Sequence, residues 1–546
     1  MRKLTFLLGL SVLACASAPA QEFRALISGR TVDPSGAAIA GADISAVNVD
    51  TNIRSATRSG LDGNFALPQL RAGTYALTAE ATGFRKYTRQ GLVVAVGDKA
   101  NIEIRMEVGG LEQSITVTAE LTGVESNQSV MGQLMDNKKI SELPLNGRQA
   151  FMLVQLSAGV VFTQQAFGAD AFTGTRAWDT NGALTIHGSR ASTNAFLLDG
   201  APLGMNGQWD YAPLIDSVEE FKVSTPANDA SQGLTGGGVI NMTMKSGTNR
   251  RHYLLSHFIR NHIFDAVPTQ QNRAAAARPD LAAKQHQWNN VSFVVDGPIV
   301  RNKFFYSGSY EGFWERVPFP TTQTVPTVPQ RSGDFSQTFN SAGQLMVVHD
   351  PLSTRQSGSS FVRDPFPGNR LPQERIVAVS RNLLKFVPPP NIVTNPLTNT
   401  NNFGAAPNVG KYAYNSWYMK FDYVWNDFHR TFFSETQNYG SEYNSYNGLP
   451  FGNPARTGDD LLRRDHYAAT LDHVYTVTPR TVLNARLAWD RYISYSRRSS
   501  IDDFDGSALG FKGRTGSFPV PRIPALSFSD YLSLVNSGNS FPPNEV

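Results

Sequence analysis

Apolar and polar residues alternate along much of the second half of the chain. Within 417–426, one face carries Trp417, Met419, Phe421, Tyr423 and Trp425, and the other carries Lys420, Asp422 and Asn426. Within 481–491, Leu483, Ala485, Leu487 and Trp489 lie opposite Asn484, Arg486 and Asp490. Successive side chains of a strand point to opposite faces, so this alternation predicts strands. We expect seven of them, each long enough to cross a membrane at a tilt, at 251–260, 286–296, 302–314, 415–426, 429–438, 465–476 and 481–492.

The connections between these predicted strands alternate in length. They cover 261–285, 297–301, 315–414, 427–428, 439–464 and 477–480, so long and short ones follow each other throughout. Outer-membrane barrels have this pattern, because their strands run up and down between short periplasmic turns and long extracellular loops. A soluble sandwich has no reason to put every long loop at one end. The pattern therefore predicts the first strands of an antiparallel outer-membrane β-barrel over 249–546.

The first half of the chain has a different pattern. Residues 22–108 contain short strand-like runs separated by Gly, Pro and Asp, which predicts a small all-β sandwich. A Gly-led connector follows at 109–123. Residues 124–248 combine strand-like runs with a short amphipathic helix inside 140–160, whose apolar positions are Phe151, Leu153, Val154 and Leu156. The expected fold class is mainly β, with an α+β domain between the sandwich and the barrel strands.

Composition and targeting signals limit the function. The net charge is +4, and no Lys/Arg run suggests a nucleic-acid partner. Residues 1–20 have a basic start, an apolar core and Ala18-Pro19-Ala20 before Gln21, which predicts a secretory signal peptide. The alternative is a lipoprotein signal acylated at Cys15. No later stretch reaches 18 apolar residues, so we expect any membrane crossing to be made by strands.

Candidate chemistry is scarce in this sequence. We find no HExxH, GxSxG or paired CxxC motif, and the nine histidines lack metal-ligand spacing. The segment 501–506 resembles a calcium loop but lacks the distal Glu of an EF-hand. Glu219 and Glu220 are adjacent on a predicted strand, so they face opposite ways and are expected to be surface charges rather than an acid–base pair. We expect no enzyme activity, no catalytic residue, no metal and no cofactor.

Two sets of motifs carry family resemblances. The segments "GRTVDPSGAAIAGADI", "GNFALPQLRAGTYALTAEATGF" and "IEIRMEVG" resemble the carboxypeptidase regulatory-like domain, over 25–108. That resemblance implies a sandwich that accompanies another domain, not a peptidase. The ordered segments "IHGSR", "LLDG", "SVEEFKV" and "GGGVINMTMKSGTN" resemble the plug domain of TonB-dependent outer-membrane transporters. This second resemblance implies that the plug is shaped by Ile186, His187, Gly188, Ser189, Arg190, Asp199, Gly200, Gly236, Gly237 and Gly238.

Together with "VSFVVDGPIVRNKFFYSGSYEGFWER", "TVPTVPQRSGDFS" and "LLKFVPPPN", these domains resemble the Oar-like branch of that family. The resemblance implies a TonB box formed by Ser114, Ile115, Thr116, Val117, Thr118, Ala119 and Glu120, which would bind the partner TonB by strand addition. The alternative is a last sandwich strand or a β-prone linker. Such a transporter needs about 22 strands, so the seven predicted ones suggest the N-terminal portion of a longer protein or a truncated reading frame.

The expected function is transport of an unidentified extracellular ligand across the outer membrane of a Gram-negative bacterium. The alternative is a surface-binding or adhesive protein that uses a plugged barrel as an anchor in outer-membrane lipid. A secreted soluble β protein would leave the alternating loop lengths unexplained. No ligand-specific motif identifies the ligand, and the sequence contains no signal for an oligomeric state.

Overall fold

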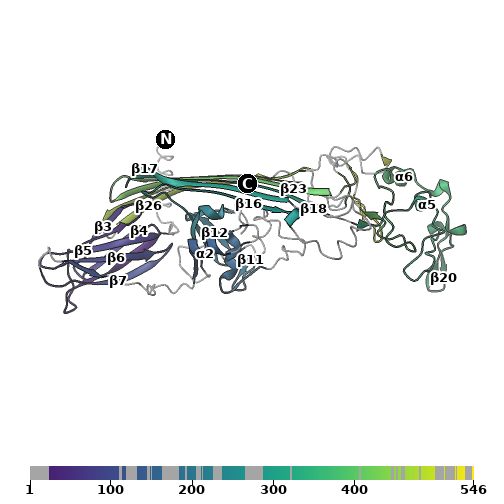
Figure 1. Cartoon of the computed structure of the whole chain (residues 1–546). Coiled ribbons are helices and arrows are strands. Elements are labelled where there is room, and N and C mark those ends of the chain that lie inside the picture. The colour runs from purple at the N-terminus through teal and green to yellow at the C-terminus, as the bar shows by residue number, and fades with distance from the viewer. Residues whose placement is uncertain are drawn as a thin grey trace, which may run out of the picture.

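A computed structural model shows an elongated molecule with a β-sandwich at one end and a cluster of loops at the other (Figure 1). It describes residues 24–109, 114–117, 132–143, 145, 148, 150–162, 184–190, 193–204, 211, 213–224, 236–264, 287–319, 322–404, 408–443, 448–450, 453–456, 461–478, 481–497, 509–510, 523, 525–534 and 544–545. The predicted signal peptide with Cys15, the residues Thr118, Ala119 and Glu120, and the segment 501–506 lie outside the described residues.

The β-sandwich consists of two sheets that share one core. The first sheet has the order β4-β1-β7, from Asn64–Leu70, Ala25–Val32 and Lys99–Arg105. The second has the order β3-β2-β5-β6-β8, from Arg54–Arg58, Asp43–Asn48, Gly73–Glu80, Lys86–Val94 and Ser114–Val117. Along β7 the buried positions Ala100, Ile102 and Ile104 alternate with exposed ones. The period-two pattern of the sequence thus supplies the facing apolar surfaces.

The central unit, residues 132–244, is a mixed sheet with short helices. Its five-stranded sheet has the order β13-β12-β15-β14-β9, from Ala201–Pro202, Ala195–Leu198, Val239–Met244, Val218–Ser224 and Gly132–Met135. A second pair joins β10 (Val160–Phe162) to β11 (Leu184–Ile186). The helical elements are α2 (Asn137–Glu142) and the 3-10 helices η2 (Ala150–Leu156) and η3 (Ile215–Ser217). Strands β12 and β15 run parallel, so Leu197 and Leu198 of the segment "LLDG" lie beside the segment "GGGVINMTMKSGTN".

The amphipathic helix predicted within 140–160 is the 3-10 helix η2. Leu153 and Val154 are buried as expected, whereas Leu156 is about half exposed. An α-helix was missed just before it. The side chain of Asp136 caps α2 by accepting from the Lys139 amide, and Leu143, which precedes Pro144, is extended and ends it.

The strand wall is an eight-stranded antiparallel sheet with the order β16-β17-β18-β23-β24-β25-β26-β27. Its strands are His252–Asn261, Gln287–Val300, Phe304–Phe319, Asn408–Val424, His429–Tyr443, Leu461–Thr478, Thr481–Arg497 and Asn544–Glu545. All seven predicted strands are therefore present, and most are longer than predicted. The short strand β27, which pairs with β26, was not predicted. The chain is mainly β, as expected.

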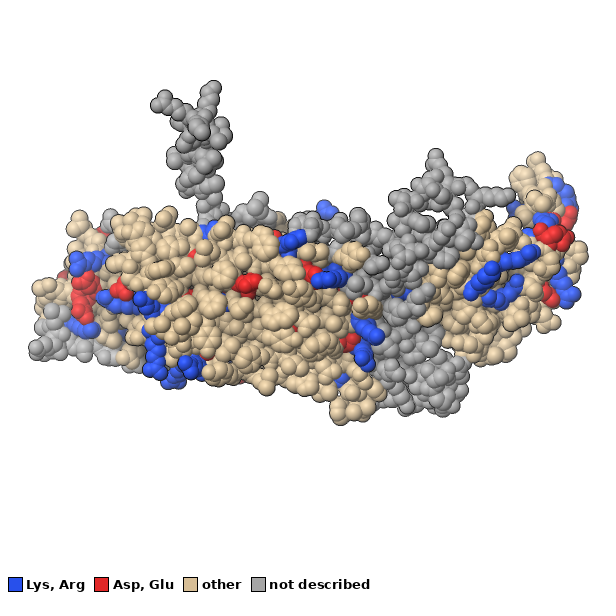
Figure 2. All heavy atoms as spheres, turned by 90° about the horizontal axis from the view of Figure 1, so that it is seen from above, with Lys and Arg blue, Asp and Glu red and all other residues tan. Residues whose placement is uncertain are grey.

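The two faces of the strand wall differ in polarity. On β26 the predicted apolar face is open to the surroundings, since Leu483 is 58% exposed and Leu487 is 72% exposed. On β23 Trp417 and Met419 are also exposed, while Lys420 and Asp422 on the opposite face are buried. Seen on its outer face, the wall is mostly free of charged side chains, with a few scattered over it (Figure 2). An apolar outside and a polar inside are what lipid contact requires.

The short and long connections of the strand wall lie at opposite ends. Turns 301–303 and 425–428 are at the sandwich end, where Arg54 of the sandwich pairs with Asp427 at 3.5 Å. The loop between β18 and β23 forms most of the loop cluster at the far end (Figure 1). It contains β19 (Thr322–Gln323), α5 (Val328–Arg331), η7 (Pro351–Ser353), β20 (Arg355–Ser357), β21 (Ser360–Val362), η8 (Pro367–Asn369), η9 (Gln373–Arg375), α6 (Ala378–Leu384) and β22 (Phe403–Gly404).

The loop cluster has a small apolar core of its own. Val325, Val387 and Phe403 pack there with residues from later loops, such as Leu449 and Ile523.

A further 3-10 helix, η5 (His262–Phe264), follows β16. In the described part of the chain, no helix has both the length and the apolar character needed to span a bilayer.

Candidate functional site

The best-defined polar site lies where the central unit meets the inner face of the strand wall. Lys420 on β23 points its Nζ at Asp199 Oδ1, 2.9 Å away, and the Tyr418 hydroxyl donates to Asp199 Oδ2 at 3.0 Å. All three side chains are almost fully buried. A buried carboxylate and ammonium are tolerated only when paired and hydrogen-bonded. This contact therefore fixes the central unit against the wall.

Local sequence explains why Asp199 can serve this contact. The segment "LLDG" ends β12, and Asp199 and Gly200 both have positive φ, 49° and 75°, so the chain reverses into β13. Asp tolerates this conformation better than most residues with a side chain. Its Oδ1 also accepts from the Met244 amide at 3.1 Å. The carbonyl of Gly200 accepts from Arg486 Nη1 at 2.7 Å, which adds a second link to the wall.

The other predicted plug residues gather at the opposite end of the β12–β15 pair. Ile186 is buried on β11, and His187 and Gly188 both have positive φ. A Cβ added at Gly238 would lie 2.4 Å from Ile186 Cδ1, and one at Gly237 would lie 2.3 Å from Asn194 Oδ1 and 3.0 Å from Ser189 Oγ. At Gly236 the nearest atom would be 3.7 Å away.

Close packing therefore requires glycine at Gly237 and Gly238 but not at Gly236. Asn194 ties the two segments together, since its side chain accepts from the Gly238 amide and donates to the Leu184 carbonyl. The backbone of Arg190 accepts from the Thr193 hydroxyl at 2.6 Å. The structure thus brings the "IHGSR" and "GGG" segments together but leaves Asp199 and Gly200 at the other end of β12.

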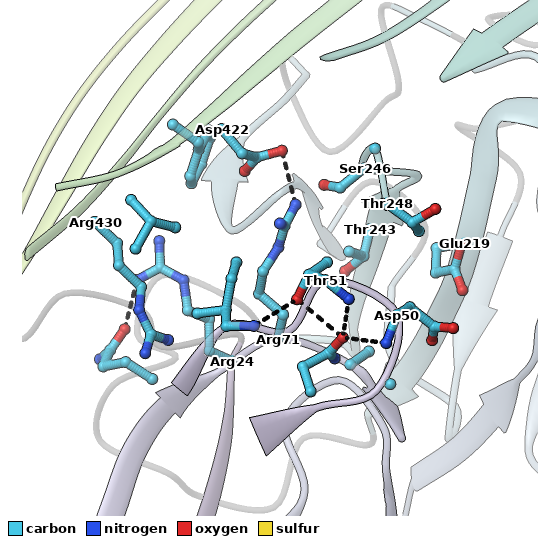
Figure 3. A pocket seen from close by; sticks show the side chains of 18 of the residues that line it. Arg24, Asp50, Thr51, Arg71, Glu219, Thr243, Ser246, Thr248, Asp422 and Arg430 are labelled. Atoms are coloured by element: carbon cyan, nitrogen blue, oxygen red, sulfur yellow. Dashed lines mark hydrogen bonds and ion pairs between the residues drawn. The ribbon is translucent and has the colours of Figure 1, made fainter. Parts of the chain in front are cut away.

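A cavity of about 170 Å³ opens beside the Asp199–Lys420 contact (Figure 3). The sandwich, the central unit and the strand wall all contribute side chains to it. Arg24 and Arg71 reach in from the sandwich, Glu219 and Thr243 from the central unit, and Asp422 and Arg430 from the wall.

Ion pairs across this cavity join the sandwich to the wall. Arg71 Nη2 lies 2.7 Å from Asp422 Oδ2, and Arg24 pairs with Asp472 on β25. Desolvation lowers the pKa of the Arg71 guanidinium, but Asp422 outweighs it, so the net shift is upward. Arg430 donates to the Ser55 hydroxyl and the Arg54 carbonyl, at 2.5 Å and 3.1 Å. The sandwich is thereby held on the wall by charge-assisted contacts.

The sandwich also contacts the central unit directly. The Val96 amide donates to the Glu220 carboxylate, and Lys222 lies 3.8 Å from Asp98. Burial raises the pKa of Glu220 to about 7, against the opposing effect of the Val96 hydrogen bond. Burial likewise lowers the pKa of Lys222. The expectation that Glu219 and Glu220 are surface charges is wrong, because the loop after β6 covers Glu220 and Glu219 is partly buried at the cavity.

The described part of the predicted TonB box is β8. Ser114, Ile115, Thr116 and Val117 pair in parallel with Lys86 to Arg89 of β6. β8 is thus the edge strand of the second sandwich sheet.

The structure offers little else that could carry chemistry. In the residues that it describes, no group of three or more His, Cys, Asp or Glu side chains could hold a metal ion. Sequence reasoning placed Lys420 and Asp422 on a polar strand face but did not find their partners, Asp199 and Arg71. No local signal could have found them, because the partners lie more than 200 positions away in the chain.

Comparison with protein families matches residues 243–545 to the outer membrane beta barrel domain. The chain belongs to this family. It is an outer-membrane protein of Gram-negative bacteria, as predicted. Residues 26–107 match the carboxypeptidase regulatory-like domain, which confirms the resemblance of the sandwich.

One curated relative is the TonB-dependent transporter Oar of Myxococcus xanthus. It is 26% identical over 200 residues, which cover 35% of this chain and 17% of that protein. The matched part of the chain thus spans about a sixth of the relative's length. This similarity confirms the Oar-like resemblance.

Similar solved structures include the outer membrane transporter YddB from Escherichia coli. It has a TM-score of 0.40 at 12% identity, over 68% of this chain and 40% of that chain. The siderophore receptor PirA from Acinetobacter baumannii has a TM-score of 0.31 at 12% identity, over 69% and 50%.

Proposed function

We propose that this chain works in TonB-dependent transport of an extracellular ligand across the outer membrane. In this proposal residues 22–108 form a periplasmic sandwich, 109–123 a connector with the TonB box, 124–248 the plug, and 249–546 part of the barrel wall. The similarity to the transporter Oar supports transport as the general activity.

The observation that carries the proposal is the buried contact between Asp199 and Lys420. A plug must be held on the inner face of a barrel wall by contacts strong enough to seal it, yet limited enough in number to be broken. The central unit lies on the polar inner face of the wall and is attached there by this contact, by the Arg486–Gly200 hydrogen bond and by longer hydrogen bonds such as Ser416–Tyr211 and Ser292–Asp216. The motif residues then have structural roles. Asp199 and Gly200 attach the plug to the wall, and Ile186 to Arg190 pack with Gly237 and Gly238 inside the plug.

The position of the sandwich supports one orientation in the membrane. Short turns of outer-membrane barrels face the periplasm. Because turns 301–303 and 425–428 lie at the sandwich end, the sandwich would face the periplasm and the loop cluster the outside. In that orientation TonB could reach β8 (114–117), and a ligand would arrive at the loops.

The experiment is a binding measurement with the purified periplasmic domain of TonB and the whole chain in detergent. We expect Val117→Pro to abolish binding, because proline removes a backbone donor that strand addition uses. Val117→Ala, which keeps the donor, should bind as the unmodified chain does. Equal binding by Val117→Pro and the unmodified chain would exclude the segment as the coupling site.

A further inference from the structure

The candidate coupling strand β8 is part of the sandwich sheet. Its four residues pair in register with β6, with Thr116 opposite Thr88. The preceding chain is also attached there, since the Arg85 amide donates to the Glu107 carbonyl at 2.8 Å and the Gly109 amide to the Gly83 carbonyl at 3.1 Å. The segment that would meet the periplasmic partner is therefore held by the sandwich on one side.

The other side of β8 is open among the described residues. In the sheet order β3-β2-β5-β6-β8 the strand has a single neighbour, so its second row of backbone N–H and C=O groups has no strand partner in the described part of the chain. Such a row is a template for another strand. β8 is only four residues long, which limits the edge to a short docking segment.

We propose that the partner strand, from the periplasmic domain of TonB, adds to the outer edge of β8 while β8 stays paired with β6. The docking surface is then the whole five-stranded sandwich sheet, extended by one strand, rather than an isolated peptide. This inference rests on the proposed function and specifies how its partner binds.

Energetics favour this arrangement over release of β8. Peeling β8 from β6 would break ladder hydrogen bonds before any new ones form. Addition at the outer edge breaks no ladder hydrogen bond between the described strands. The sandwich itself is attached to the wall by the Arg71–Asp422 and Arg24–Asp472 pairs, so β8 is presented on a fixed support.

A cross-link between β6 and β8 tests the proposal. Neighbouring strands lie about 4.8 Å apart, within the range that a disulfide can bridge. Thr88→Cys combined with Thr116→Cys would lock β8 onto β6, in a Cys15→Ser background that has no other cysteine. Ser45→Cys with Thr78→Cys is the matched control, because these residues pair between β2 and β5 of the same sheet.

Binding of the TonB periplasmic domain to the whole chain is measured for both pairs, oxidised and reduced. We expect the dissociation constant of the Thr88/Thr116 pair to change by less than about twofold on oxidation, as for the control pair. A loss of roughly tenfold or more that reduction reverses would overturn the proposal, because the partner would then require released β8. Failure of this pair to oxidise, while the control pair does, would overturn it too. Absence of binding by the unmodified chain would instead reject the proposed function itself, and this inference with it.

Discussion

Lys420 Nζ lies 2.9 Å from Asp199 Oδ1 in a site where both side chains are almost completely removed from solvent. Asp199 ends a strand of the central unit, and Lys420 stands on the inner face of the wall, 221 positions later. The carboxylate also accepts from Tyr418 and from the Met244 amide. One aspartate therefore links two units that the chain builds separately.

Removing the charge of Asp199 should weaken this attachment strongly. Asp199→Asn leaves Lys420 buried without a counter-ion, and we expect a loss of about 3–5 kcal/mol in the free energy of unfolding. Urea unfolding of the protein in detergent micelles would measure it. The double variant Asp199→Asn with Lys420→Gln should recover part of the loss. Asp364→Asn, at the exposed pair with Arg355, is the control and should leave the midpoint unchanged. Equal midpoints for Asp199→Asn and this control would contradict the prediction.

The three adjacent glycines should respond unequally to alanine. A Cβ at Gly238 would meet Ile186 Cδ1 at 2.4 Å and the Ser224 carbonyl oxygen at 2.8 Å, and the backbone atom cannot easily move. We expect Gly238→Ala to lower the free energy of unfolding by about 1–3 kcal/mol, as overpacking does. Gly236→Ala, whose Cβ would meet Thr193 at an ordinary contact distance of 3.7 Å, should be close to neutral. Urea unfolding in detergent micelles would measure both variants. Equal effects would show that the close contacts at Gly238 do not affect the free energy of unfolding.

Docking of the sandwich on the central unit should weaken as the pH rises. Burial raises the pKa of Glu220 from 4.5 to about 7 in the docked state, so docking favours the protonated carboxyl. The stabilisation is fully present below pH 4.5 and is lost as the pH rises to about 7, by up to about 1.4 kcal/mol per pH unit. Hydrogen exchange of the Val96 amide, corrected for its intrinsic rate, reports the opening.

The isosteric variant Glu220→Gln provides the control for this pH dependence. It keeps an acceptor for the Val96 amide but cannot ionise, so protection of Val96 should become nearly independent of pH. A slope that persists in Glu220→Gln would assign the effect to another group, of which Glu219, Asp98 and Lys222 are the nearest charges.

The outer face of β26 should not accept a charge. Leu487 is 72% exposed in the middle of this strand, on the face that we expect to meet lipid. Leu487→Arg should cost about 2–4 kcal/mol if it lies near the bilayer midplane, and should lower the fraction of protein that inserts into vesicles. Leu61→Arg, at a position of the sandwich that is 92% exposed, should insert normally. Equal insertion of both variants would exclude lipid contact at Leu487.

The strands of the wall could be predicted from the sequence because the alternation that identifies a strand is a local pattern. Alternation over ten or more residues, as at Trp417 and Met419, identifies both the strand and its face. The 3.6-residue period of η2 was less informative, since the element is a short 3-10 helix whose Leu156 remains exposed. The conformation of a short element depends on the units that pack against it, and a periodic pattern over seven residues does not predict that packing.

The contacts between units could not be predicted in the same way. Glu220 sits in a charged, strand-like segment and looked like a surface residue, yet the loop at Val96 buries it. Asp199 was singled out by its motif, but its partner Lys420 was one of several polar residues on a strand face. Pairings of this kind depend on how separately folded units meet, which no single segment encodes.

The pairing of Arg24 with Asp472 imposes an order on biogenesis. These residues are 448 positions apart, one at the start of the sandwich and the other on β25. The sandwich is complete in sequence long before β25 is synthesised, whereas its anchoring residues Asp422, Arg430 and Asp472 lie on β23, β24 and β25, so full docking requires all three of these strands. An undocked sandwich therefore marks an immature molecule. Periplasmic proteases could use that difference to distinguish unfinished copies from mature ones.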